Sequence, residues 1–123
     1  MTWLETTLAL VWVHTMADFV AQTDRMAMLK SKSNGWLLLH TFVYGLLFVP
    51  FGWLFALVNF AAHTATDWLT SRCTSRLWAA SVANPSHKAF GKSLRGWFFV
   101  VIGIDQAIHI TTLVATWAWL GAT

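Results

Sequence analysis

The chain of 123 residues is long enough for one domain, and apolar side chains dominate it. Apolar residues make up 57% and charged residues only 11%, whereas a soluble domain carries about 25% charged residues. This balance argues against a water-soluble globule and makes lipid the expected solvent. The formal charge of +3 is not gathered in a long basic stretch, so no nucleic-acid partner is expected. The single cysteine, Cys73, excludes a disulfide within this sequence.

Four apolar stretches predict four helices, which lie at residues 3–21, 36–49, 53–70 and 97–120. Crossing a membrane takes about 20 apolar residues, so the second stretch is short. Pro50 and Gly52 predict a tight turn after it, because proline cannot continue a helix and glycine accepts turn geometry. We therefore expect one all-α domain over residues 1–123, an integral membrane bundle of about four transmembrane helices.

Every lysine and arginine lies in one of two connecting segments, residues 22–35 and 71–96. In a serpentine of four helices these two segments share one side of the membrane. The positive-inside rule makes them cytoplasmic loops and leaves both termini outside. Their basic side chains are explained most simply as a topology signal, and they would also suit anionic lipid headgroups. The candidates for headgroup contact are Arg25, Lys30, Lys32, Arg72 and Arg76.

The same apolar stretches carry an unusual number of ionisable side chains. Three of them contain a histidine and an aspartate four residues apart, a spacing that puts both on one helical face. The order within the pair reverses in the last stretch, where the helix direction also reverses, so each aspartate is expected on the cytoplasmic side of its histidine. With His40 in the second stretch, the candidate metal ligands are His14, Asp18, His40, His63, Asp67, Asp105 and His109.

Burying these groups in a bilayer is costly, at about 2.5–3.5 kcal/mol for one aspartate at a helix centre. They are therefore expected to face inward and to be satisfied by partners. Three interpretations fit this expectation: ligation of one or two divalent metals, with zinc first and iron or manganese as alternatives; a proton or ion relay; and a hydrogen-bonded network that only locks helix packing. Gln22 and Gln106 are candidate donors that would orient the ligands.

These motifs resemble those of a family of small multi-pass membrane proteins from bacteria and their phages, domain-of-unknown-function family 3307. The resemblance spans nearly the whole chain, and it rests on His14-x3-Asp18-Phe19-x2-Gln22, Met26-Ala27-x2-Lys30, Leu-Leu-Leu-His40, His63-x3-Asp67 and Asp105-Gln106-x2-His109. The resemblance implies a helical membrane fold in a bacterium or phage and implies no reaction. Together with the distribution of basic residues, it leads us to expect a location in the bacterial inner (cytoplasmic) membrane with both termini periplasmic. The phage association adds modification of the host envelope, or exclusion of infection, to the functions to be weighed.

The hypothesis that unites these features is a metal site open to the cytoplasmic leaflet, in a metal-dependent hydrolase acting on a lipid or other membrane-associated substrate. The candidates for a catalytic acid or base are Asp18, Asp105 and His40. The first alternative is a proton- or cation-conducting component, for which a bundle this small would need to form a homo-oligomer. The second is a non-catalytic phage or envelope interaction protein with a structural His/Asp network.

Overall fold

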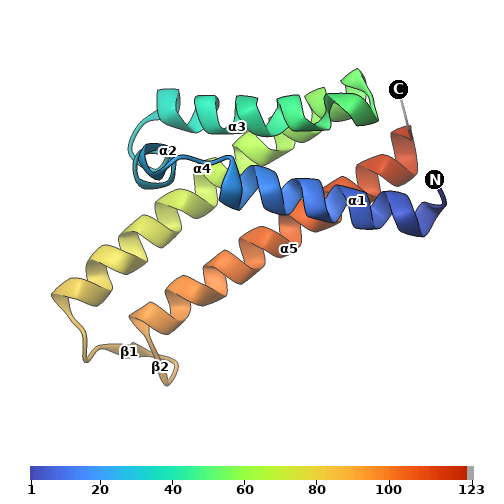
Figure 1. The fold of residues 1–123 in the computed structure, drawn as a ribbon. Coiled ribbons are helices and arrows are strands. Elements are labelled where there is room, and N and C mark those ends of the chain that lie inside the picture. The colour runs from blue at the N-terminus through green and yellow to red at the C-terminus, as the bar shows by residue number, and fades with distance from the viewer. Residues whose placement is uncertain (122–123) are drawn as a thin grey trace.

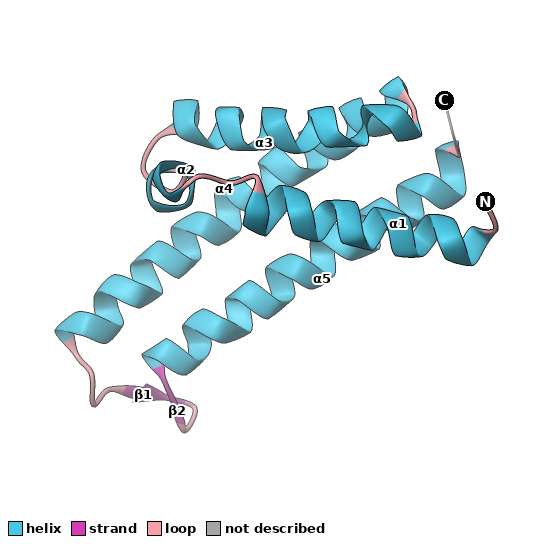
Figure 2. Ribbon diagram, viewed as in Figure 1, coloured by secondary structure: helices cyan, strands magenta, loops and turns pink. Residues whose placement is uncertain are grey.

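The computed structural model describes residues 1–121, and these are almost entirely helical. The helices in chain order are α1 (Trp3–Thr15), η1 (Met16–Val20), α2 (Asp24–Leu29), α3 (Asn34–Phe48), η2 (Val49–Phe51), α4 (Trp53–Ala83) and α5 (Leu94–Leu120). Two very short strands, β1 (Lys88–Ala89) and β2 (Lys92–Ser93), pair as an antiparallel hairpin between α4 and α5 (Figure 2). The expected all-α class is therefore confirmed.

Four long helical segments form the body of the fold. The helix α4 packs against both α3 and α5, and α1 lies across α3 and α5 (Figure 1). The start of α1 and the end of α5 lie at one end of this body, while α2 and the start of α3 lie at the other. Among the described residues, two helical stretches are long and apolar enough to cross a membrane, Asn34–Phe51 and Leu94–Leu120.

The turn between α3 and α4 follows the prediction from its sequence. Pro50 lies in the single 3₁₀ turn η2, where its missing N–H is tolerated at the start of a helical turn. Gly52 has a φ of 127°, a conformation that L side chains rarely adopt, and α4 begins at the next residue. This turn brings His40 and His63 onto adjacent antiparallel helices.

The helix α4 is longer than expected. Residues 71–96 were predicted to form a loop, yet α4 continues to Ala83 and α5 begins at Leu94. The basic residues after residue 70 indicate where an apolar stretch ends, but arginine, serine and alanine do not end a helix. Pro85 follows closely on the observed end. The last turns of α4 and the first turns of α5 therefore project from the body as an arm (Figure 1).

The interior has an apolar part and a polar part. The apolar core surrounds Leu10, Phe48, Phe55 and Leu113, with Trp117 packed edge-on against Phe55 near the η2 turn. The polar part lies nearer α2 and contains buried histidines and aspartates from η1, α3, α4 and α5. The apolar core fixes the relative positions of the helices that carry these polar side chains.

Candidate metal centre

Asp18 lies in a π-helical turn rather than in regular α-helix. In η1 the N–H of Ala21 donates to the carbonyl oxygen of Met16 at 2.8 Å, a spacing of five residues. A π-helical turn holds more residues than an α-helical turn, and such turns are frequent at functional sites. Because η1 begins between His14 and Asp18, the wider turn rotates Asp18 relative to His14. Asp18 is thus directed toward α3 and α4.

Four side chains converge on one point inside the bundle. Asp18 from η1, His40 from α3, and His63 and Asp67 from α4 each offer one ligand atom, and these four atoms lie within 4.8 Å of one another. His40 Nε2 lies 3.1 Å from Asp18 Oδ1 and 3.2 Å from Asp67 Oδ2. His63 Nε2 lies 3.5 Å from each of the same oxygens. All four residues are buried. We call them the inner donor set.

The inner donor set is rich in lone pairs and poor in protons. The two histidine Nε2 atoms lie 3.1 Å apart, and at most one neutral ring can donate to the other. Asp18 Oδ1 is buried and has no hydrogen-bond partner among the described residues, although the two ring nitrogens lie beside it. A cation placed between these four atoms would satisfy their lone pairs together.

A second set adjoins the first. Asp18, Asp105 and His109 also offer ligand atoms within 4.8 Å of one another, and we call them the second donor set. His109 Nε2 lies 3.1 Å from Asp105 Oδ1 and 3.0 Å from Asp67 Oδ1. Asp18 therefore belongs to both sets, while Asp67 offers one oxygen to the inner set and the other to His109. Six of the seven predicted metal ligands belong to one or both sets.

His14 is the seventh, and it lies outside both donor sets. Its Nε2 lies 2.8 Å from Gln106 Oε1, and its Nδ1 lies 3.0 Å from the hydroxyl of Tyr44. The amide of Gln106 donates to Asp18 Oδ2 at 2.8 Å and to Asp105 Oδ2 at 3.1 Å, so its Oε1 must accept. His14 then carries its proton on Nε2 and accepts from Tyr44 on Nδ1. Both ring nitrogens of His14 already have hydrogen-bond partners, so His14 orients Gln106 and does not offer a nitrogen to a metal.

Gln106 lies between two aspartates as expected for a residue that orients ligands, whereas Gln22 does not contact any of them by hydrogen bond. Gln22 Oε1 is buried and has no hydrogen-bond partner among the described residues. His63 is held differently. Its Nδ1 also has no partner in the described part of the chain, and its ring stacks on Tyr44 at 3.7 Å between centroids, with the planes 12° apart.

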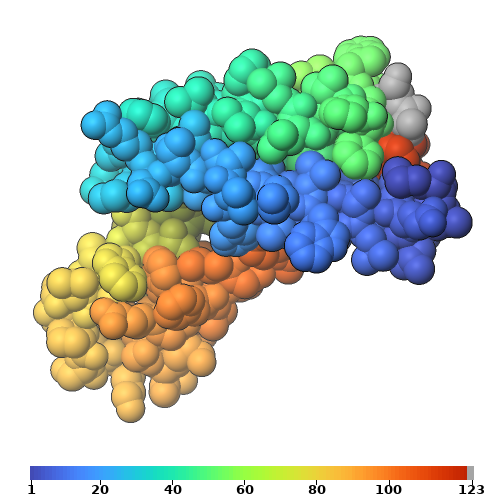
Figure 3. Space-filling model, viewed as in Figure 1, coloured from blue at the N-terminus to red at the C-terminus, as the bar shows by residue number. Residues whose placement is uncertain are grey.

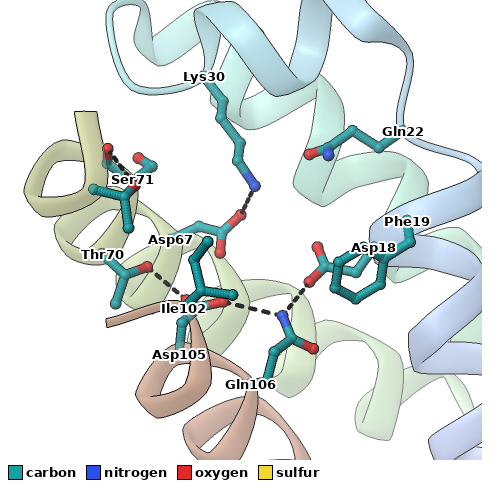
Figure 4. Close-up of a pocket in the computed structure, with 11 residues that line it drawn as sticks. Asp18, Phe19, Gln22, Lys30, Asp67, Thr70, Ser71, Ile102, Asp105 and Gln106 are labelled. Atoms are coloured by element: carbon teal, nitrogen blue, oxygen red, sulfur yellow. Dashed lines mark hydrogen bonds and ion pairs between the residues drawn. The ribbon is translucent and has the colours of Figure 1, made fainter. Parts of the chain in front are cut away.

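Lys30 enters the site from the end of α2. Lys30 was predicted to contact lipid headgroups, and its Nζ lies 3.0 Å from Asp67 Oδ2 in the structure (Figure 4). The sequence alone does not predict this contact, because it depends on how the chain after α2 folds back toward α4. Arg72 was also predicted to contact headgroups. In the structure its guanidinium donates to Asn34 Oδ1 and to the carbonyl oxygen of Trp68. The side chains of Arg25, Lys32 and Arg76 are exposed.

A cavity of about 160 Å³ adjoins the two donor sets. Three carboxylates, from Asp18, Asp67 and Asp105, line it together with Lys30 and Ser71 (Figure 4). Thr70 donates to Asp105 Oδ1 at 2.5 Å along the same wall. Thr70 and Ser71 could not be selected from the sequence, since hydroxyl residues are common in such helices. Tyr44 lies one helical turn from His40 and could have been found only through that spacing.

Residues 6–123 match the family described as "Protein of unknown function (DUF3307)", so the chain belongs to that family. No curated protein and no solved structure matches the chain.

Proposed function

We propose that this member of the family is a multi-pass membrane protein that binds a divalent metal at the inner donor set and hydrolyses a lipid or other membrane-associated substrate from the cytoplasmic leaflet. The observation that carries the proposal is the spacing of the four donor atoms. For a tetrahedral ion with bonds of roughly 2.0–2.1 Å, ligand atoms lie about 3.3–3.4 Å apart. Five of the six separations in the inner donor set lie between 3.1 and 3.5 Å.

The charge of the site supports a divalent ion. Asp18, Asp67 and Asp105 bring three carboxylates to one buried region, and Lys30 is the cation that the described residues place against them. With neutral imidazoles, two negative charges are left, which equals the charge of one divalent ion in magnitude. An uncompensated buried charge costs several kcal/mol, so a bound cation would remove a large penalty.

The donor types favour zinc, with iron or manganese as alternatives. Two imidazole nitrogens and two carboxylate oxygens are ligands that all three ions accept, and four-coordination is the usual zinc geometry. The second donor set supplies room for another ion beside the first, with Asp18 common to both sets. Paired metals are common in enzymes that cleave phosphate esters and peptides.

The surface of the helices supports the membrane location. Large apolar side chains are exposed on all four long helices, among them Trp12 (67%), Phe42 (55%), Leu57 (55%) and Ile104 (52%). A soluble monomer rarely exposes so much contiguous apolar surface, whereas lipid solvates it. Four transmembrane segments with cytoplasmic loops would place the donor sets in the cytoplasmic half of the bilayer, since α2 and the basic arm lie on that side of the site.

The chemistry follows from what surrounds the donors. A metal ion bound there would acidify a coordinated water and make it a nucleophile near neutral pH. Asp105 lies on the cavity wall, where Thr70 and Gln106 donate to it and hold its carboxylate, and it would act there as the general base. Gln106 holds Asp18 and Asp105 in fixed orientation, and His14 holds Gln106.

Elemental analysis of the detergent-purified protein tests this proposal. Wild type should contain near-stoichiometric zinc, iron or manganese, and the variant His63→Ala/Asp67→Ala should lose it while keeping its helical circular dichroism. The control is His87→Ala/Asp24→Asn, which changes two exposed residues of the same types and should retain the metal. Absence of metal from the wild type, even after reconstitution with each ion, would overturn the metal site and the hydrolase with it.

A further inference from the structure

The cavity beside the donor sets adjoins a second one. The inner cavity, of about 160 Å³, and an outer cavity, of about 430 Å³, share Lys30, Ser71 and Thr74 on their walls. The outer cavity lies between α2 on one side and the arm of α4 and α5 on the other. Figure 3 shows the molecular surface hollowed between the blue N-terminal part and the yellow and orange arm. The outer cavity alone falls in the range of about 300–1,000 Å³ typical of ligand sites.

The wall shared by the two cavities carries one unpaired hydroxyl and one ammonium group. Ser71 is only 7% exposed, and its hydroxyl has no hydrogen-bond partner among the described residues. A buried hydroxyl left unpaired costs about 1–3 kcal/mol, so a partner is expected from outside the chain. Lys30 Nζ has three protons and makes one contact that the structure defines, with Asp67. An ammonium and a hydroxyl facing one space suit an oxyanion with several acceptor oxygens.

The carboxylates beyond Lys30 decide which oxyanion can bind. Asp18, Asp67 and Asp105 would repel an anion in the inner cavity unless a cation lies between them and it. A divalent metal at the donor sets supplies that cation, so this step depends on the function proposed above. Phosphate groups are commonly bound between a metal ion and a lysine, because both neutralise the charge on the phosphate oxygens.

The outer cavity has an apolar side that a soluble phosphate would not use. Met28, Trp78 and Phe98 line it, and Trp78 and Phe98 pack together with their ring centroids 5.2 Å apart. Met28 is 71% and Trp78 43% exposed. Lys32, on the same wall, adds a second cation near the opening. A basic and apolar surface at the expected level of the membrane interface suits the junction of a lipid headgroup and its chain.

From this we infer that the two cavities bind the phosphate monoester headgroup of a membrane lipid. Lys30 and Ser71 hold the phosphate oxygens, and Met28, Trp78 and Phe98 contact the carbons next to the ester. In the hydrolysis that follows, the oxygen of a water forms a bond to phosphorus and the bond between phosphorus and the ester oxygen breaks. The water gives a proton to Asp105, and the departing ester oxygen takes a proton from water in the outer cavity. The products are a lipid alcohol and inorganic phosphate.

Binding of dioleoyl phosphatidate to zinc-loaded protein in detergent micelles tests this inference, with metal content measured on the same samples. Wild type should bind phosphatidate saturably. Lys30→Met should weaken binding about 10-fold or more, because a hydrogen bond to a charged group is lost, and Ser71→Ala should weaken it several-fold. The matched controls, Lys88→Met and Ser81→Ala, should bind as wild type does. Lys88 is exposed in the hairpin, and the hydroxyl of Ser81 already donates to the carbonyl oxygen of Trp78.

Two other ligands separate the possible sources of the phosphate. Phosphatidylcholine, a diester with a capped phosphate, should bind much more weakly than phosphatidate. Glycerol 3-phosphate, which has the same monoester and no chains, should also bind more weakly. Equal binding of glycerol 3-phosphate would overturn the lipid assignment, and equal binding of phosphatidylcholine would overturn the monoester assignment.

Metal content keeps the two proposals apart. Protein that holds zinc but binds no phosphatidate contradicts the headgroup site and leaves the metal site standing. If the wild type binds no metal, both proposals fail together, because the three carboxylates of the inner cavity would then repel the phosphate.

Discussion

At the scale of single residues, each of the carboxylates in the site serves more than one partner. Asp67 contacts His40, His63, His109 and Lys30 through its two oxygens, and Asp18 contacts both histidines of the inner donor set and Gln106. A carboxylate whose two oxygens both have partners is held in one rotamer and keeps its position in the donor set. This is the kind of preorganisation that a metal site needs.

Gln106 is proposed to act on the metal site indirectly, because its amide holds the carboxylates of Asp18 and Asp105 in place. Gln106→Met removes the two hydrogen bonds to Asp18 and Asp105 at similar side-chain length. Metal affinity should fall about 10- to 100-fold, as for other residues that orient ligands, while the helices stay folded. Competition with a zinc-binding dye measures the affinity.

Asn59→Leu is the control for this change. Asn59 carries a buried amide too far from the donor sets to orient them, since it donates to the carbonyl oxygen of Phe55 and to Thr116. The substitution Asn59→Leu should leave the metal affinity unchanged. Equal losses in both variants, or no loss in Gln106→Met, would mean that Gln106 has no particular role at the metal.

The sequence predicted which residue types would gather and missed how some of them are used. The spacing of four residues put each aspartate near its histidine correctly for His63 and Asp67 and for Asp105 and His109. It failed for His14 and Asp18, because the π-helical turn η1 between them changes their relative direction. The hydrogen-bond partners of Lys30 and Tyr44 could not be predicted from the sequence, since they lie 37 and 30 residues away along the chain.

At the scale of elements, helix positions were predictable from apolar stretches, whereas helix ends were not always so. Pro50 and Gly52 predict a turn, and the structure confirms a turn at these residues. Nothing in the sequence marks the end of a helix at residue 70, because a change from apolar to basic residues ends an apolar stretch and leaves helix propensity intact. The arm that results forms one wall of the outer cavity.

Gly52 provides the test at this scale. Its φ of 127° and ψ of 136° lie where a Cβ is strained, so Gly52→Ala should lower the free energy of unfolding by about 1–3 kcal/mol. Unfolding in mixed micelles, followed by circular dichroism, measures the change. Because the turn sets how α3 meets α4, metal affinity should fall in parallel.

Gly103→Ala is the matched control. Gly103 is inside α5, and a Cβ added there would meet no heavy atom within 4 Å. Alanine in a helix interior should stabilise the protein by about 0.5–1 kcal/mol. If the two variants shift stability in the same direction, the backbone argument for Gly52 is wrong.

At the scale of the whole molecule, the fold has two ends of different character. The termini-side end has an apolar core around Phe48, Phe55 and Trp117, and the opposite end has the donor sets, the cavities and most of the basic residues. A protein arranged in this way across a bilayer would be sealed on one side and open on the other. That asymmetry fits chemistry on a substrate from the cytoplasmic leaflet better than conduction across the membrane.

The native cysteine reports this orientation. Cys73 is exposed on α4, beyond Asp67 toward the arm. A membrane-impermeant maleimide should label it in inside-out vesicles and leave it unlabelled in spheroplasts. In the variant Thr2→Cys/Cys73→Ser the pattern should reverse. Labelling of both positions from the same side would contradict the proposed arrangement of four transmembrane segments.

We propose that two histidines and two aspartates from three different helical elements hold one metal ion, and zinc K-edge X-ray absorption on the zinc-loaded protein measures this coordination. We predict a first shell of about four nitrogen and oxygen atoms at roughly 2.0–2.1 Å, with outer-shell scattering from two imidazole rings. In His40→Ala the scattering of one ring should be lost. A shell of six water-like oxygens without imidazole scattering, or a spectrum unchanged in His40→Ala, would contradict the account.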